Sequence, residues 1–344
     1  MSKFLLVSVG PAMILLSGAA PIPQRAILTV PHAPRAVVID GRRQLRYELY
    51  ISNRGGSGPS PTRIEAIDAA SGAVIGALTG EALRRSIATV GRGDALVVYW
   101  QLEFPPARLV PARLRHRVVI DGVTVDGGDT APLRPALPQL GSPLRGGPWA
   151  AAYDPGLTRG HRRAIYATDG AAHIPGRYAI DWFYAGGNDG RGAEVLAVAD
   201  ATVAAVRDDM EEAAGVSVQS IPLADGTGNF VALHLADGSF AVYEHLARGI
   251  PLRVGQRVAR GQVIGHVGAT GHASRPHLHF HVADGLSSLA SEGLPFRVTG
   301  ATIIGRYADV FAASSGGSWT AVRPYRLSAR TGDMPAPNVV VRFD

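Results

Sequence analysis

The sequence predicts a mainly β protein, with an N-terminal Ig-like β-sandwich followed by an antiparallel β-sheet domain. Glycine and proline are abundant, with 42 and 24 residues among 344, and long stretches of helical periodicity are few. Apolar and polar residues alternate in many short segments, which is typical of half-buried strands. Only 18% of the residues are charged and 46% are hydrophobic, so the chain is suited to compact cores rather than to disorder.

The N-terminus has the pattern of a secretory signal peptide. Lys3 precedes an apolar run, and small residues at 18–20 predict cleavage after Ala20. Pro11 interrupts a run that is already shorter than the ~20 apolar residues of a membrane-spanning helix. We therefore expect residues 1–20 to be removed, with an uncleaved anchor as the alternative. In either case the protein would work outside the cytoplasm, either secreted or in the periplasm or cell envelope.

Residues 26–127 are expected to form the sandwich. Four alternating segments resemble half-buried strands, and glycine-rich turns separate several of them. They read "RYELYISN", "TRIEAID", "DALVVYWQLEF" and "RLRHRVVIDG". Several strands at this spacing within about 100 residues favour a sandwich. One short helix is expected at 79–87. His32 and His116 are isolated here, so we expect them to be surface or packing residues.

The rest of the chain divides by composition. Residues 128–149 are dense in proline and glycine and are the expected linker. A second domain is expected over 150–297, because nine of the eleven histidines fall between 161 and 281. The strand-like segments over 298–344 either return to the sandwich or cover the second domain, and the sequence leaves both arrangements open.

Two segments of the second domain place polar residues at the ends of apolar strands. "RYAIDW" ends an alternating strand with Asp181, where an unpaired carboxylate would be costly. "FAVYEHLARG" places His245 at a strand end, after a hairpin turn predicted at Asp237-Gly238. Both residues are therefore candidates for chemistry rather than for the core.

The third segment, "RPHLHFHV", alternates histidines with apolar residues. His277, His279 and His281 should therefore line one face of a strand, with the first two about 6.6 Å apart. The chain has no cysteine, so any metal must be held by His, Asp or Glu. Catalytic zinc uses three such ligands and an open position for water. Together with Asp181 and His245, the pattern predicts a zinc site.

These sequence motifs also resemble those of a known protein family. "AIDW", "YEHLARG" and "RVGQRVARGQVIGHVGATGHASRPHLHFHV" occur in the order found in peptidase family M23, the lysostaphin- or LytM-like zinc metalloendopeptidases with the duplicated hybrid motif fold. The resemblance covers about residues 160–285. It implies that Asp181 and His279 bind Zn²⁺ and that His245 and His277 are catalytic. It also implies hydrolysis of peptidoglycan cross-links by a metal-activated water.

The first metal ligand departs from the family pattern. The family has a histidine four residues before the aspartate, where this chain has Arg177, and arginine stays protonated and cannot bind a metal. His173 would lie ~26 Å from Asp181 in an extended chain. A hairpin about Asp169-Gly170 would instead bring His161 opposite roughly 178–181, where cross-strand neighbours lie ~5 Å apart. We prefer His161 to His173; loss of the zinc site is the third possibility.

The remaining histidines and the charge complete the expectations. His281 should be structural or lie behind the metal ligands, ~13 Å from His277. His234 and His266 are expected to be sheet residues, and His272 to lie in an exposed loop. The net charge of +6 comes almost entirely from arginine, which favours an anionic partner such as a wall polymer or reflects genome composition.

The expected partner is a peptidoglycan peptide, with no nucleic acid, no stable membrane span after signal removal, and a monomeric chain. The alternative function is a non-catalytic LytM-like regulator that activates cell-wall amidases. Such regulators have lost several site residues. Because Asp181, His245, His277 and His279 are all present, the enzyme is favoured.

Overall fold

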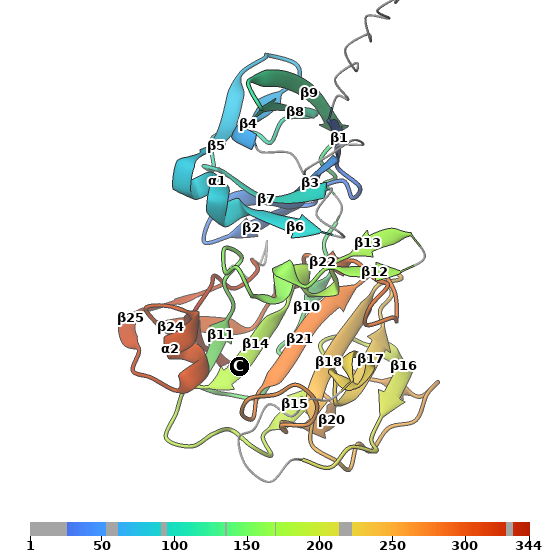
Figure 1. The fold of residues 1–344 in the computed structure, drawn as a ribbon. Helices are drawn as coiled ribbons and strands as arrows, with labels where there is room; N and C mark the ends of the chain where they lie inside the picture. Colours follow the sequence, from blue (N-terminus) through green and yellow to red (C-terminus); the bar gives the residue numbers. More distant parts are fainter. Residues whose placement is uncertain are drawn as a thin grey trace, which may run out of the picture.

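The computed structural model describes residues 26–52, 61–90, 95–134, 136–168, 170–212, 222–327 and 333–344. The predicted signal peptide and Asp169 lie outside the described residues. The described part is mainly β with antiparallel sheets, which confirms the predicted mainly β class. Its strands form an upper and a lower body (Figure 1). Among the described segments, no helix has the length and apolar character needed to cross a membrane.

The upper body is built from two facing sheets. Its elements are β1 (Ile27–Thr29), β2 (Ala36–Ile39), β3 (Arg42–Ser52), β4 (Pro61–Asp68), β5 (Val74–Thr79), α1 (Gly80–Ser86), β6 (Ile87–Val90), β7 (Ala95–Phe104), β8 (Leu114–Ile120) and β9 (Val123–Thr130). One sheet has the order β1-β3-β7-β6 with β2 beside β3, and the other β5-β4-β8-β9. Leu45 and Trp100 from the first sheet meet Ile64 and Val118 from the second in a common core. Burial of these alternating apolar residues holds the two sheets together.

The lower body contains a large antiparallel sheet. Its strands are β11 (Trp149–Ala152), β14 (Ile180–Tyr184), β16 (Ala201–Arg207), β17 (Asn229–His234), β18 (Phe240–Leu246), β19 (Arg257–Val258), β21 (Leu278–Ala283), β22 (Gly293–Leu294), β24 (Ala301–Arg306), β25 (Thr320–Arg326) and β26 (Val339–Phe343). The order is β19-β16-β17-β18-β21-β14-β11-β26-β24-β25, with β22 beside β21. The C-terminal strands therefore extend this sheet next to β11 and do not return to the sandwich.

Short elements surround this sheet. They are β10 (Gln139–Leu140), η1 (His161–Arg163), β12 (Tyr166–Thr168), β13 (Ala171–His173), η2 (Pro175–Tyr178), β15 (Glu194–Leu196), η3 (Leu223–Asp225), β20 (Val263–His266), β23 (Arg297–Val298) and α2 (Val310–Ser315). The predicted linker, 128–149, includes the end of β9 and also β10, which pairs with β23. Within it, the backbone N–H of Leu133 donates to Pro34. This connection is therefore packed against both bodies.

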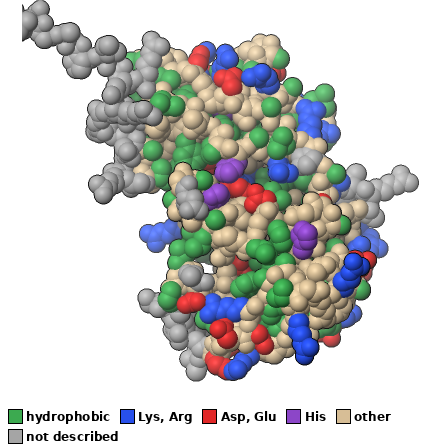
Figure 2. Space-filling view, turned by 90° about the vertical axis from the view of Figure 1, so that its right-hand side faces the viewer, with side chains coloured by type: hydrophobic (Ala, Val, Ile, Leu, Met, Phe, Trp, Pro, Cys, Tyr) green, Lys and Arg blue, Asp and Glu red, His purple; other side chains and the backbone are tan. Residues whose placement is uncertain are grey.

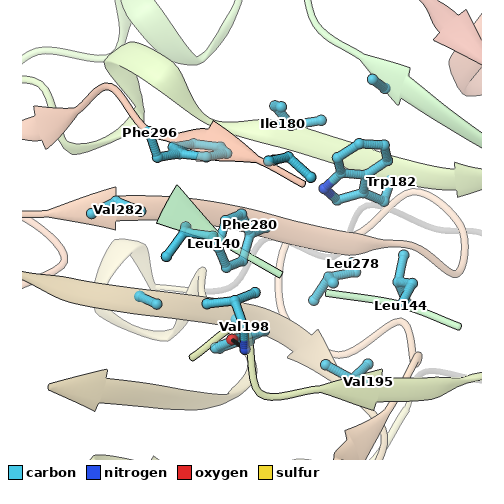
Figure 3. Packing of buried hydrophobic residues seen from close by; sticks show 14 of the residues in the cluster. Leu140, Leu144, Ile180, Trp182, Val195, Val198, Leu278, Phe280, Val282 and Phe296 are labelled. Atoms are coloured by element: carbon cyan, nitrogen blue, oxygen red, sulfur yellow. Dashed lines mark hydrogen bonds between the residues drawn. The ribbon is translucent and has the colours of Figure 1, made fainter. Parts of the chain in front are cut away.

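The pairing of β14 with β21 sets the direction of the site residues. Asp181 lies opposite His279, between the pairs Ile180–Phe280 and Trp182–Leu278. Figure 3 shows Ile180, Trp182, Leu278 and Phe280 packed together in the apolar core. Because side chains alternate along a strand, Asp181 and His279 project from the opposite face.

The two bodies meet through a buried interface ion cluster of Glu48, Arg162, Arg177 and Glu292. Glu48 of β3 pairs with Arg162 of η1 at 3.2 Å and with Arg177 of η2. Arg177 also pairs with Glu292 at 2.5 Å. Each of these side chains is at least nine-tenths buried. The arginine that occupies the expected ligand position is thereby directed to the interface between the bodies.

Candidate metal centre

His161, Asp181 and His279 form a compact cluster on the face of β14 and β21 that lies opposite the apolar core. The Nε2 atom of His161 lies 2.8 Å from Oδ2 of Asp181, and Nδ1 of His279 lies 2.8 Å from Oδ1. One ligand atom from each residue lies within 4.8 Å of the others. Imidazole nitrogens and a carboxylate oxygen are the ligands that zinc takes from proteins without cysteine. The cluster therefore fits a divalent metal ion.

His161 reaches Asp181 by a route that differs from the predicted one. β12 and β13 do form a hairpin, with Tyr166 opposite His173. However, His161 lies in the 3-10 helix η1, and β14 pairs with β11 and β21. The predicted cross-strand register with 178–181 is therefore wrong. Instead η1 packs on η2, where a Cβ at Gly176 would lie 2.9 Å from the Cβ of His161, so only glycine fits without a shift.

His173 lies in a different cluster. Its Nδ1 is 3.6 Å from Oε1 of Glu292, and Nε2 of His32 is 3.2 Å from the same oxygen. His32 thus packs at the boundary between the bodies. Of the two histidines considered for the first ligand position, only His161 lies at Asp181.

His277 and His245 lie beside the cluster with fixed ring orientations. The Nδ1 atoms lie 2.8 Å from the carbonyls of Arg275 and Thr270, respectively. Because a carbonyl only accepts, each Nδ1 carries a proton and each Nε2 of the neutral ring is free to accept one. Nε2 of His277 is 3.7 Å from Oδ1 of Asp181, and the His245 and His277 rings are 4.8 Å apart.

His245 has a backbone φ of 65°, in the left-handed region that residues with a Cβ rarely adopt. In a regular strand Glu244 and His245 would point to opposite faces. Here the His245 ring lies 5.9 Å from that of His279, and the Glu244 carboxylate also lies near His279. The unusual backbone conformation lets both neighbours face the site.

Glu244 is a residue of the site that the sequence reasoning missed, whereas His281 was expected to be structural or to lie behind the metal ligands. Glu244 lies directly opposite His279 in the pairing of β18 with β21. Its Oε1 is 4.0 Å from Nδ1 of His281, whose ring lies 5.3 Å from that of His279. The signal in the sequence was a glutamate within the otherwise apolar strand "FAVYEHL".

Burial and neighbouring charges set the protonation of these groups. Burial alone would raise the pKa of the Asp181 carboxyl, but the charges of His161 and His277 and hydrogen bonds from His161 and His279 hold this pKa well below its usual range. Burial also lowers the pKa of His245 and His277, most strongly for His245. It would lower the pKa of His279 too, but the Glu244 and Asp181 carboxylates raise this pKa. These shifts leave the Asp181 carboxylate ionised and the His245 and His277 rings neutral, and an ionised carboxylate is the state that binds a metal ion.

The cluster opens into a cavity of about 180 Å³. The residues that line it include His161, Tyr166 and Leu289. His272, which is exposed as expected for its loop, also lines this cavity. His234 and His266 lie in β17 and β20, respectively, and are exposed there. The cavity gives a substrate access to the histidine cluster.

Residues 179–290 match the model of Peptidase family M23, which confirms the resemblance seen in the motifs. Among solved structures, the chain is similar to the catalytic domain of the antimicrobial peptidase lysostaphin from Staphylococcus simulans (26% identity, 38% of this chain and 85% of that chain, TM-score 0.25). It is also similar to a variant of the catalytic domain of the prophage-encoded M23 protein EnpA from Enterococcus faecalis (21%, 44% and 92%, 0.29). A third similar structure is a zinc-containing peptidase from Vibrio cholerae (15%, 72% and 80%, 0.27). With TM-scores this low, we infer nothing about the present chain from these three structures.

Proposed function

We propose that this protein is a zinc metalloendopeptidase that acts outside the cytoplasm and hydrolyses peptide cross-links of bacterial peptidoglycan. The observation that carries the proposal is the cluster of His161, Asp181 and His279 with two further histidines beside it. The match to Peptidase family M23 supports the peptidase class. The signal-like N-terminus and the net charge of +6 suit a protein that meets an anionic wall polymer.

His161 through Nε2, Asp181 through a carboxylate oxygen and His279 through Nδ1 would hold the Zn²⁺ ion. The ionised Asp181 would offset part of the charge of the metal ion. Three protein ligands would leave one coordination position for water. When bound, zinc supplies Lewis acidity, which lowers the pKa of a water molecule and polarises the scissile carbonyl. Glu244, opposite His279, would fix the orientation of this ligand ring from behind.

His277 and His245 would act as the general acid and base that transfer protons during the reaction. Each has an unprotonated Nε2 and an Nδ1–H held by a backbone carbonyl. Either Nε2 can accept a proton from the attacking water, and the protonated ring can then donate it to the leaving amine or to the developing oxyanion. His277 lies nearer to Asp181, so it is the first candidate for proton acceptance.

Incubation of the purified protein with defined muropeptides, followed by mass spectrometry, tests this function. We expect the zinc-loaded wild type to cleave a peptide cross-link. His277→Ala and His245→Ala should each lower kcat by about 10²–10⁴-fold, the usual size of a general acid–base contribution. His234→Ala is the matched control, because this histidine is exposed on β17. Failure of the zinc-loaded wild type to cleave any muropeptide would contradict the proposal.

A further inference from the structure

A second cavity, of about 290 Å³, opens on the candidate metal centre. We call it the α2-side cavity, because residues of α2 line it. His161 and Asp181 also lie in its wall, and their side chains are 42% and 18% exposed, so a molecule in the cavity can reach them. The cavity of about 180 Å³ described above is lined by His161 and His279. Two cavities therefore border the three proposed metal ligands.

The pairing of β11 with β14 brings α2 close to Asp181. Ala152 lies opposite Asp181 in this pairing and belongs to a small buried cluster with Ala313 of α2. Phe183, which follows Asp181 by two residues and therefore shares its strand face, belongs to the same cluster. Figure 1 shows α2 beside β11. Because Ala313 holds the helix on the sheet, another side of the helix can line the cavity. The residues on that side are Val310, Phe311 and Ser314.

The walls of the α2-side cavity favour an apolar group over an ion. Phe311 is 65% exposed, so a ligand can cover its ring, and Leu157 lines the cavity too. The charged side chains of Arg159 and Asp154 are both exposed on the walls and are opposite in sign. The other two arginines in the walls belong to the interface ion cluster and are paired there. An apolar ligand group that covers Phe311 would gain the free energy of burying both surfaces.

Most of the α2-side cavity lies outside the residues that match the family model. The match covers residues 179–290, whereas α2 follows this range and the residues of 152–164 that line the cavity precede it. Of the residues that line the cavity, only Ala179 and Asp181 fall within the matched range. The match to the family therefore does not say what this cavity binds.

We propose that the α2-side cavity is a substrate subsite, which binds an aliphatic side chain of the peptide next to the scissile bond. A peptide whose scissile carbonyl lies at the metal ion extends away from it in both directions, and two cavities border the metal ligands. Phe311 and Leu157 would cover the aliphatic side chain, and its burial would favour it over glycine. This inference rests on the proposed function, because the ligand is the substrate of that site.

Two synthetic muropeptides test the subsite, one with alanine and the other with glycine at the residues that flank the scissile bond. For the zinc-loaded wild type we expect kcat/KM to be at least about tenfold higher with the alanine peptide, since one buried carbon is worth this much in an apolar pocket. Phe311→Ala should lose most of this preference and keep its zinc. Tyr325→Ala is the matched control, because Tyr325 is an exposed aromatic residue of β25 that lines neither cavity. It should keep the preference of the wild type.

The boundary between the two bodies is the alternative place for a bound peptide. Figure 2 shows histidine and acidic side chains gathered there, and His32, His173 and Glu292 bring one ligand atom each within 4.8 Å. None of these three residues lines either cavity at the metal centre. A preference that is lost in His32→Ala and kept in Phe311→Ala would place the peptide at this boundary and overturn the proposal.

Calorimetric titration of zinc-loaded His277→Ala with the same two peptides separates the subsite from the catalytic function. Cleavage of neither peptide by the wild type would contradict the proposed function, and the titration then decides about the subsite. We expect His277→Ala to bind the alanine peptide more tightly than the glycine peptide, and the double variant with Phe311→Ala to lose most of this difference. Binding of neither peptide, equal affinities for the two, or an equal difference with and without Phe311→Ala would overturn the subsite.

Discussion

His116 is a buried titratable side chain in the core of the sandwich. Its Nε2 lies 2.7 Å from the hydroxyl of Tyr47, and its Nδ1 lies 2.9 Å from the carbonyl of Gly128. The ring is therefore neutral, with Nδ1–H donating to the carbonyl and Nε2 accepting from the tyrosine. Burial lowers the pKa of His116 to about 4. Of the two roles expected for His116, surface or packing residue, the structure shows the second, whereas its hydrogen bonds could not be seen in the sequence.

This low pKa predicts a pH dependence of stability. Between pH 6.5 and about 4 the unfolded ring takes up a proton and the folded ring does not, so the free energy of unfolding falls as pH falls. The contribution is fully present above pH 6.5, and its loss approaches about 3 kcal/mol below pH 4. Urea denaturation across this range measures it. His116→Gln should flatten the slope, whereas the exposed His234→Gln should not; equal slopes in both variants would contradict the assignment.

The residues of the metal centre differ in how far the sequence revealed them. Asp181 and His279 follow from alternation, because a polar residue in an apolar strand must find a partner. The role of Glu244 did not follow from alternation, because in a regular strand the side chains of Glu244 and His245 would point to opposite faces. The left-handed backbone of His245 reverses this, and nothing in "YEHL" requires that conformation.

The short helix η1 is the element that brings His161 to the site. Its next residue, Arg162, is buried and donates to the carbonyls of Tyr47 and Trp100 at 3.0 and 2.6 Å. Arg162 also pairs with Glu48. These partners belong to the sandwich, so the upper body holds η1, and with it the imidazole of His161, in position.

We therefore expect Arg162→Met to weaken zinc binding by about 10–100-fold, the usual cost of losing the support of a metal ligand. Competition with a chromophoric chelator measures the affinity. Arg145→Met is the matched control, because Arg145 forms an exposed pair with Glu194. An affinity equal to that of the wild type in Arg162→Met would show that η1 keeps its position without this anchor.

Strand pairings set by local turns could be predicted, whereas elements held by distant contacts could not. The hairpin about Asp237-Gly238 is present, with His234 opposite Phe240. The Asp-Gly turn dipeptide is sufficient to predict this hairpin. In contrast, η1 is three residues long and depends on the sandwich, from which it is separated in the sequence. Alternation therefore suggested a strand at 161, where the structure has a 3-10 turn.

At the scale of the whole molecule, the interface ion cluster joins the two bodies. Glu48→Gln would remove the charge that offsets Arg162 and Arg177 in a buried setting. We expect the free energy of unfolding to fall by about 3–5 kcal/mol, the cost of breaking a buried pair on one side. Urea denaturation measures the change, and Glu81→Gln in an exposed pair is the control. A loss no larger than that of the control would contradict a role of this cluster in joining the bodies.

The composition predicts two domains, but it does not predict the contact between the two bodies. Glu48, Arg162, Arg177 and Glu292 are spread over most of the sequence, and no local pattern links them. The placement of the C-terminal strands beside β11 was equally undetermined, since their alternation suits either body. Arg177 had been notable only as a missing ligand, and its function as an interface residue became visible in the folded chain.

The most direct test of the central claim is the zinc content of the purified protein, measured with His161→Ala and His173→Ala side by side. Each variant removes one histidine that was a candidate for the first ligand position, but only His161 lies at Asp181. We expect about one zinc per chain in the wild type and in His173→Ala, and a marked loss in His161→Ala. Full zinc content in His161→Ala, or its loss in His173→Ala, would contradict the assignment of His161, Asp181 and His279 as the metal centre.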